Sequence, residues 1–269
     1  LNTPFNEASA QVFVNVIHDA LLGNASASEL LLPRVDLSEL FPVPAGRFLA
    51  VNRGRIQVGC TIEGIRIEPR GRGFLLDGDS EKQRFSDVVI ATAPYHAGAL
   101  LACDSRCAPL AAQIDAFRHE PISTVYLQYD EAVRLPHAMI GLADGPLQWA
   151  FDRHALGGPP GLIAGVISTA AGHLGMGRSE LEQAAHGQLQ RALGRPLAKP
   201  RRTLTITEKR ATLACTPALR RPGIRTPVAG LWLAGDYLDS PYPATLESAV
   251  HSGVAVAQAI VRGYQAQQG

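Results

Sequence analysis

The chain has 269 residues, 46% of them hydrophobic, so it is long enough to bury a sizeable core in one large domain or in two smaller interleaved ones. Its 25 lysines and arginines nearly balance 24 acidic residues, which gives no field of one sign for a polyanion, and we expect no nucleic acid partner. The longest apolar runs, residues 161–167 and 253–261, are shorter than the ~18 residues that cross a bilayer.

The four cysteines, Cys60, Cys103, Cys107 and Cys215, show neither a disulfide framework nor the paired spacing of a zinc site. We therefore expect no metal centre and a reducing, cytoplasmic compartment.

The first expected element is a helix that begins at Thr3-Pro4 and ends at Gly23, because Thr3 is a good N-cap and apolar residues follow at helical spacing. A proline-punctuated apolar segment over residues 30–44 cannot be one long helix, and such a segment typically lines a groove.

A period of two then predicts short strands over residues 55–60, 62–68, 74–76 and 87–92, with turns at 71–73 and 77–79. Residues 88–93 are apolar on both faces. This pattern is typical of a strand buried in a parallel sheet, and Pro94 ends it.

The middle of the chain alternates helices with strands, which we expect over residues 124–129, 148–152, 162–168 and 203–213. Ser179 and Glu182 have the spacing of a capping box, and Gly194 ends the helix that they would begin. We therefore expect an α/β fold with an α+β insertion that contains a mixed sheet.

The last forty residues predict a buried strand over 230–234 and a helix from about Ala244 to Arg262. Gly235 and Asp236 lie at the strand end, where open α/β sheets bind ligands and a helix N-terminus offers free N–H groups. The alternative is an ordinary strand-to-loop turn in which Asp236 forms an Asx cap. Arg220, Arg221 and Arg225 are expected to lie in a solvated loop.

Several motifs carry a resemblance to a known family. The C-terminal run LWLAGDYLDSPYPATLESAVHSGVAVAQAI resembles the flavin motif of the FAD-dependent amine oxidase and phytoene desaturase superfamily, and VNRGRIQVGCTIEGIRIE with FSDVVIATAP is similar to its β-ribbon and adjoining strand. Four segments look like the squalene-associated FAD-dependent desaturase group, also called hydroxysqualene dehydroxylases: LNTPFNEASAQVF, LLLPRVDLSELFPVPA, EKRATLACTPALRRP and DYLDSPYPATLESAVHSG.

The resemblance implies a set of FAD-binding residues. Gly235 and Asp236 would face the ribityl chain and phosphate, and Ile62 would lie beside the adenine. The backbone N–H groups near the flavin ring would come from Ala244, Thr245 and Leu246.

The superfamily opens with a βαβ unit that carries GxGxxG, and this sequence contains no such motif. We therefore expect the chain to be the C-terminal portion of a flavoprotein whose FAD site is incomplete. Residues 48–98 and 227–269 would form the FAD side, and residues 1–47 and 99–226 the substrate domain.

The resemblance further implies an oxidoreductase that acts on a long isoprenoid of the squalene type in hopanoid synthesis. In the dehydroxylase reaction an acid helps an allylic hydroxyl leave and reduced flavin supplies hydride. Asp239, Tyr237 and Tyr242 are the candidate acid or cation-stabilising groups, the alternative being that the tyrosines pack the loop and Asp239 caps it.

The sequence leaves open two alternative functions and a possible contact with a membrane. An amine oxidase would share the flavin motif, and a truncated chain could be a non-catalytic domain that holds no FAD alone. The isoprenoid substrate also leaves open a peripheral contact with the inner membrane.

Overall fold

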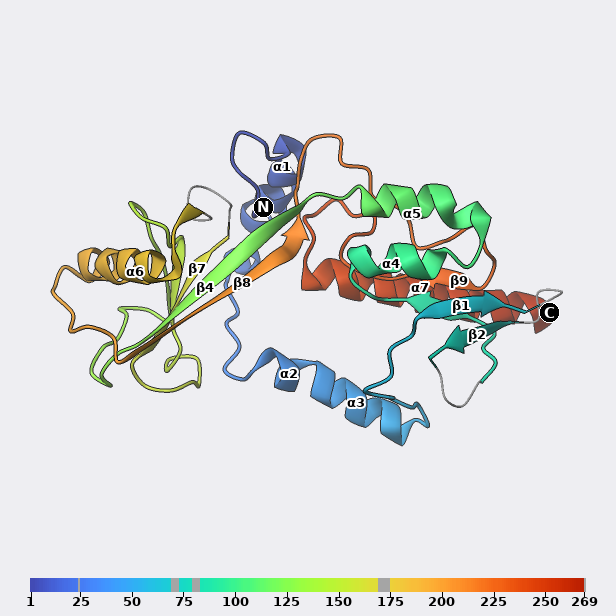
Figure 1. Ribbon diagram of the computed structural model, residues 1–269, viewed down its shortest axis with the longest axis horizontal. Helices are drawn as coiled ribbons and strands as arrows, with labels where there is room; N and C mark the ends of the chain where they lie inside the picture. The colour runs from blue at the N-terminus through green and yellow to red at the C-terminus, as the bar shows by residue number, and fades with distance from the viewer. Residues whose placement is uncertain (24, 69–72, 79–82, 169–174, 269) are drawn as a thin grey trace.

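The computed structural model describes residues 1–23, 25–68, 73–78, 83–168 and 175–268. Its elements form two lobes, and the long strands β4 (His119–Gln128) and β8 (Arg202–Leu213) run from one lobe towards the other as an antiparallel pair (Figure 1). The mixed α/β composition agrees with the expected class.

The first lobe contains a five-stranded sheet in the order β5-β6-β7-β4-β8, where β5 is Met139–Gly141, β6 is Trp149–Asp152 and β7 is Leu162–Ile167. Helix α6 (Arg178–Leu193) packs on one face, where Val125 and Leu127 of β4 are fully buried. The expectation of a mixed sheet was wrong, because every neighbouring pair is antiparallel. Strand β4 lies between β7 and β8, so the two strands joined through α6 do not pair with each other.

The second lobe is built around two small sheets. Strands β1 (Gly64–Ile67) and β2 (Phe74–Asp77) form an antiparallel ribbon, and β3 (Val88–Ile90) pairs in parallel with β9 (Leu231–Leu233). The prediction that β3 and β9 share one layer is confirmed. Strand β9 is buried throughout, whereas Val89 at the centre of β3 is exposed, so β3 is buried on only one face.

Four helical segments complete this lobe: α4 (Pro94–Leu101), a 3-10 turn at Ser105–Cys107, α5 (Ala108–Asp115) and α7 (Leu246–Gln268). Buried residues of α4, α5, β3 and β9 share one hydrophobic cluster. Helix α5, which the sequence assigned to the substrate domain, thus packs with the FAD-side strands β3 and β9. The division into domains stays a prediction.

Helix α1 (Ala10–Leu21) begins later than expected. The Thr3 hydroxyl, which we expected to cap it, accepts a hydrogen bond from the Cys215 amide, and Ser9 caps the helix by accepting from Val12 N–H. A 3-10 turn at Ala25–Ser28, α2 (Leu37–Leu40) and α3 (Pro42–Val51) follow, so the proline-rich segment is broken as expected.

Helix α6 also begins differently from the prediction. Its N-cap is Gly177, and Ser179 lies inside the helix, where its hydroxyl accepts from the Gln183 side chain. Glu182 accepts hydrogen bonds from Thr203 and Thr205 of β8 instead of closing a capping box. Gly194 ends the helix in a left-handed conformation, as expected.

Residues 55–60 do not form the expected strand. A strand needs a partner strand for its backbone groups, and none of the strands in the described parts of the chain pairs with residues 56–60. The turns expected at 71–73 and 77–79 include residues 71, 72 and 79, which lie outside the described residues.

Candidate functional site

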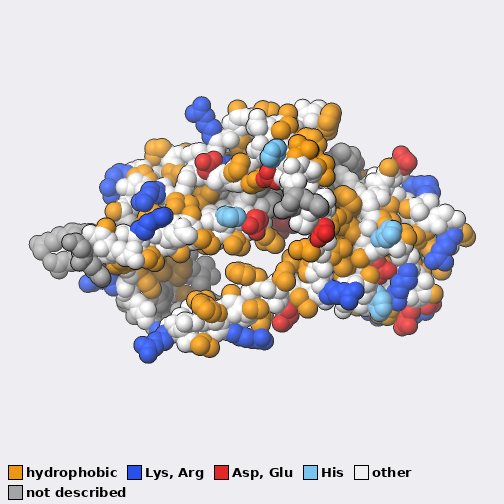
Figure 2. All heavy atoms as spheres, turned by 180° about the vertical axis from the view of Figure 1, so that it is seen from behind, with side chains coloured by type: hydrophobic (Ala, Val, Ile, Leu, Met, Phe, Trp, Pro, Cys, Tyr) orange, Lys and Arg blue, Asp and Glu red, His pale blue; other side chains and the backbone are white. Residues whose placement is uncertain are grey.

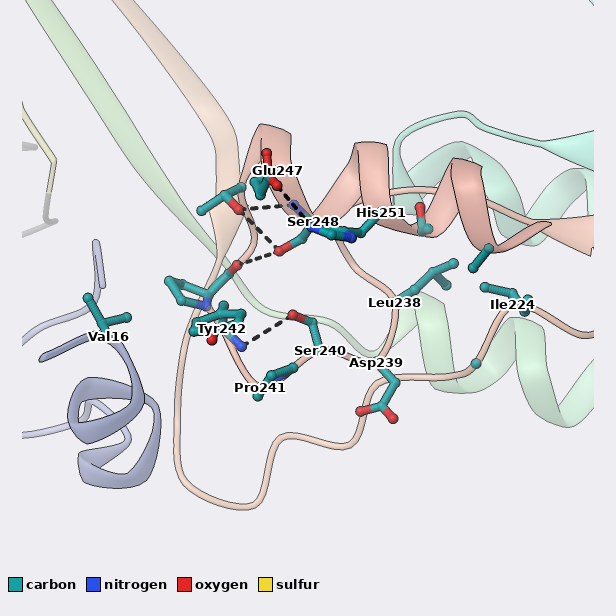
Figure 3. A pocket seen from close by; sticks show the side chains of 15 residues that line it. Val16, Ile224, Leu238, Asp239, Ser240, Pro241, Tyr242, Glu247, Ser248 and His251 are labelled. Atoms are coloured by element: carbon teal, nitrogen blue, oxygen red, sulfur yellow. Dashed lines mark hydrogen bonds and ion pairs between the residues drawn. The ribbon is translucent and has the colours of Figure 1, made fainter. Parts of the chain in front are cut away.

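A cavity of about 710 Å³ lies where β9 ends and α7 begins. The loop between them forms one wall, the first three turns of α7 form the second, and Val16 of α1 reaches it from the far side of the loop (Figure 3). Asn15 and Asp19 of α1 hold this loop through the Pro241 carbonyl and the Tyr242 hydroxyl. The N-terminal helix therefore helps to shape a site made by the C-terminal residues.

Gly235 allows the strand end to lie close to α7 and the loop. Its N–H donates to the Ser252 hydroxyl at 2.8 Å, and that hydroxyl donates to the Ala249 carbonyl at 2.6 Å. A Cβ at position 235 would lie 2.5 Å from the Tyr237 ring, and the backbone φ is +156°. Only glycine is free of this clash.

Asp236 follows directly, with a half-buried carboxyl group. Burial raises the pKa of this carboxyl above its ordinary value, while its own N–H, the Arg221 charge and the Tyr237 N–H act in the opposite direction. The Asp236 carboxylate is therefore held by backbone donors at the end of the strand.

Arg221 fixes the loop that follows. Its guanidinium donates to the carbonyl oxygens of Asp236, Ser240 and Tyr242, and burial lowers the pKa of this arginine. The expectation that Arg221 lies in a solvated loop was wrong. Arg225 stacks on the Trp232 ring, with its guanidinium carbon 4.8 Å from the ring centroid.

The three candidate catalytic residues lie in different environments. Asp239 lines the cavity, and its carboxylate points away from the α7 side chains (Figure 3). Tyr242 also lines it, but its hydroxyl donates to Asp19. Tyr237 is 0% exposed, belongs to the core cluster and has a hydroxyl with no partner among the described residues. The structure does not bring Tyr237 to the cavity.

The remaining cofactor candidates also differ in position. Thr245 lines the cavity and accepts from the Ser248 N–H at the start of α7, at 3.2 Å. Ala244 packs beside the core cluster, and its carbonyl accepts from the Thr212 hydroxyl. Leu246 is largely exposed, and Ile62 packs against the β1 side of the core, so neither lines the cavity.

The lining of the cavity fits a flavin ring. Its walls carry small or apolar side chains such as Ala255, Ser252 and Leu238, which leave room for a flat, uncharged ring. Among the described residues that line the cavity, Asp239 and Glu247 carry a formal charge, and there is no lysine or arginine. The residues present therefore fit the ring and its polyol chain, but not a diphosphate.

Comparison with known proteins adds to this geometry. A profile of flavin containing amine oxidoreductases matches residues 44–261. The chain belongs to this family. The residues that line the cavity, apart from Val16, thus lie inside the matched region, and the flavin expected from the sequence is the cofactor class that the family's description carries.

Two curated relatives are similar to the chain over different lengths. Hydroxysqualene dehydroxylase from Rhodopseudomonas palustris is 28% identical over 258 residues, 94% of this chain and 58% of the relative. A 15-cis-phytoene desaturase from an Oncidium hybrid cultivar is 52% identical over 50 residues, 19% of this chain and 8% of the relative. The chain therefore spans 58% of the length of the dehydroxylase relative.

A solved structure shares the fold. The crystal structure of a putative protoporphyrinogen oxidase from Exiguobacterium superposes with a TM-score of 0.64 at 15% identity, over 93% of this chain and 58% of that one. This likeness supports the amine oxidase-like arrangement of the two lobes.

Sequence reasoning missed two residues that build the cavity, Arg221 and Ser252. Both act on backbone groups far along the chain, and a spacing pattern does not reveal such partners. The only signal for Ser252 was its place among the small residues of the last helix.

We expect Gly235→Ala to destabilise the protein by about 1–3 kcal/mol, because the added methyl group overpacks against Tyr237. Gly253→Ala in α7 is the matched control. A Cβ there meets nothing within 4 Å, and alanine favours the helix by up to about 1 kcal/mol. Urea unfolding of both variants measures the difference, and equal free energies would contradict the close approach at Gly235.

We expect Arg221→Met to lower the free energy of unfolding by about 1.5–3 kcal/mol, since loop carbonyls lose a charged donor. Arg220→Met is the control because the Arg220 side chain is exposed and only its carbonyl accepts a hydrogen bond, from Gln113. Limited proteolysis should cut the 236–243 loop faster in Arg221→Met alone. Similar cutting rates in both variants would show that Arg221 does not hold the loop.

Proposed function

We propose that this chain forms the substrate domain and the ring-binding part of an FAD-dependent oxidoreductase that acts on a long isoprenoid of the hydroxysqualene type. The observation that carries the proposal is the cavity between the loop after Asp236 and helix α7, together with an uncovered apolar sheet face in the other lobe; Gly235 and Asp236 themselves do not line the cavity. The dehydroxylase relative matches 94% of the chain, which supports the same substrate class.

The uncovered sheet face provides the apolar area that such a substrate requires. Tyr126 pairs with Leu204 and Thr124 pairs with Ile206, on the face opposite to the one that α6 covers. Leu204 and Ile206 are both exposed, and a hollow of about 390 Å³ lies over them. An uncharged polyene would gain about 25 cal/mol for each Å² of apolar area buried here.

A longer groove continues the same surface. It has a volume of about 1080 Å³ and lies between the segment before α2 and the edge formed by Phe151, Arg153 and Leu162. Its lining shares Tyr126 and Leu162 with the hollow over Leu204 and Ile206, and a surface of this extent suits a chain-like ligand better than a compact one. A small amine would leave most of this area unused.

The bound flavin would supply hydride chemistry, and the residues of this chain would position both reactants. Of the three candidates, Asp239 is the one that lines the cavity and has no side-chain hydrogen bond among the described residues. We propose Asp239 as the group that assists the leaving hydroxyl. Tyr242, whose hydroxyl is bound to Asp19, would position the loop.

Turnover tests separate this function from that of an amine oxidase. Protein that carries this chain with a dinucleotide-binding half should consume hydroxysqualene and leave small primary amines unchanged. The opposite result would favour the amine oxidase alternative. A third alternative, a domain that holds no flavin alone, concerns the isolated chain, which we expect to purify without yellow colour.

A peripheral contact with a bilayer is part of the proposal because an isoprenoid substrate partitions into lipid. Within the described residues, no helix has the length and hydropathy of a membrane span. Flotation with phospholipid vesicles would test the contact.

We expect Asp236→Ala in the flavin-loaded protein to weaken flavin retention about ten- to a hundredfold, because one charge-assisted hydrogen bond contributes about 1.5–3 kcal/mol. The loss of folding stability should be smaller, since burial already disfavours the charged carboxyl. Flavin absorbance after dialysis and urea unfolding measure the two effects. Unchanged retention with a large loss of stability would make Asp236 a structural cap.

A further inference from the structure

A second cavity lies at the opposite end of α7 from the candidate site. It has a volume of about 630 Å³, and its walls come from the residues just before β3, from the turn that leads into β9 and from the C-terminal third of α7. Figure 1 shows α7 running along this lobe to the C-terminal end of the chain. The second cavity therefore lies at the amino ends of β3 and β9, whereas the candidate site lies beyond the carboxyl end of β9.

Two arginines line the second cavity without a carboxylate partner. Arg225 and Arg262 are exposed, and among the described residues no acidic side chain forms an ion pair with either. Asp87 is the acidic residue of the described lining, so this lining carries a formal charge of one positive unit. Figure 2 shows basic side chains gathered towards this end of the lobe, whereas the acidic side chains visible on the lobe lie nearer the middle of the molecule. The charge of the second cavity thus favours an anion.

Asp87 is engaged by two aromatic side chains of the same cavity. One of its carboxylate oxygens accepts a hydrogen bond from the Trp232 indole N–H at 3.0 Å. The other accepts from the Tyr264 hydroxyl at 2.9 Å. Both oxygens of Asp87 therefore orient aromatic rings, and the three side chains connect the start of β3, the strand β9 and the helix α7.

The Trp232 ring holds Arg225 in a defined position. Trp232 is 8% exposed, and the guanidinium carbon of Arg225 lies 4.8 Å from the centroid of its ring. A stacked guanidinium keeps the N–H groups along its edge, in the fork geometry that matches two oxygens of a phosphate. Because the ring is fixed through Asp87, the arginine loses little conformational freedom when an anion binds. Arg225 is therefore preorganised for an oxyanion.

We propose that the second cavity binds the phosphomonoester group of a small organic molecule, with Arg225 as a bidentate donor and Arg262 as the second cation. A phosphomonoester carries a charge of about −1.5 to −2 at neutral pH, which two arginines match better than one. The volume lies in the range of about 300–1,000 Å³ that is usual for small-molecule sites, and it leaves room for an organic part beside the phosphate. Ala259 and Ile260 of α7 would contact that organic part.

Two sources share this chemistry, a soluble phosphorylated metabolite and a lipid headgroup. Glycerol 3-phosphate is the probe for the first source, and phosphatidylcholine vesicles that contain phosphatidate are the probe for the second. Vesicles that contain phosphatidylglycerol instead are the charge control, because that lipid is an anionic phosphodiester. The two probes need no flavin, so the test is independent of the proposed function.

Tryptophan fluorescence measures binding at the cavity itself. The chain has two tryptophans, and Trp149→Phe in β6 of the other lobe leaves Trp232 as the one indole emitter. Glycerol 3-phosphate at constant ionic strength should change this emission saturably, because its phosphate would bind the guanidinium that stacks on the ring. Uncharged glycerol should have no such effect. The rise in unfolding temperature with ligand concentration gives the dissociation constant independently.

Arg225→Gln and Arg262→Gln should each weaken binding about ten- to a hundredfold, because each variant removes a charged donor from the phosphate. Both side chains are exposed, so the variants should fold normally, which urea unfolding checks. Arg195→Gln is the matched control, at an exposed arginine that follows α6 in the other lobe. It should leave the dissociation constant unchanged.

The outcomes separate the two sources and the failure of the proposal. Binding of glycerol 3-phosphate that both cavity variants weaken supports a soluble ligand, and flotation with phosphatidate vesicles that the same variants abolish supports a lipid headgroup. The absence of a saturable response to both probes would overturn the proposal. Equal weakening in Arg195→Gln, or equal flotation with phosphatidylglycerol, would reduce the interaction to general surface charge and would overturn it as well.

Discussion

The close approach of β9 to α7 at Gly235 is the contact on which the candidate site depends. The strand must end there, because the Gly235 N–H turns to Ser252 on the helix instead of continuing the ladder. That turn places Asp236 at the edge of the buried layer and sends the chain along the α7 N-terminus. A larger residue at 235 would clash with the Tyr237 ring and displace the start of the loop that forms one wall of the cavity.

The loop beyond Gly235 is held by side chains of α1 and of Arg221, mostly through hydrogen bonds to its backbone carbonyls. Arg221 binds three loop carbonyls, and α1 binds the loop through Asn15 and Asp19. Burial opposes the charge of both Asp236 and Arg221, and each charge moderates the other. The cavity can therefore keep a largely apolar interior while its rim stays polar, which suits an uncharged ring.

Local patterns predicted the elements whose partners lie within the chain. The apolar runs of β3 and β9 indicated one parallel layer, and small residues after Asp236 indicated a helix that packs closely. Hydrogen bonds between distant residues were not predictable from such patterns. The Thr3 hydroxyl accepts from the Cys215 amide, and α1 begins only at Ala10. Glu182 accepts a hydrogen bond from β8 instead of capping α6. Strand β5 has three residues and carries too little pattern to detect. Tyr237 looked like a site residue because it adjoins Asp236, but its ring fills the core.

The failure of the strand at 55–60 has a different cause. Its pattern is that of a strand, but a strand is stabilised by its ladder, and no described segment supplies one to residues 56–60. The alternation of polar and apolar residues describes only which way side chains would face, whereas the ladder depends on a second segment. The same distinction holds at the cavity: the Gly-Asp sequence marked the end of β9, but the residues that line the cavity come from the following loop, from α7 and from Val16 of α1. A local pattern therefore locates a strand end, and the packing of distant segments decides which side chains surround the space beyond it.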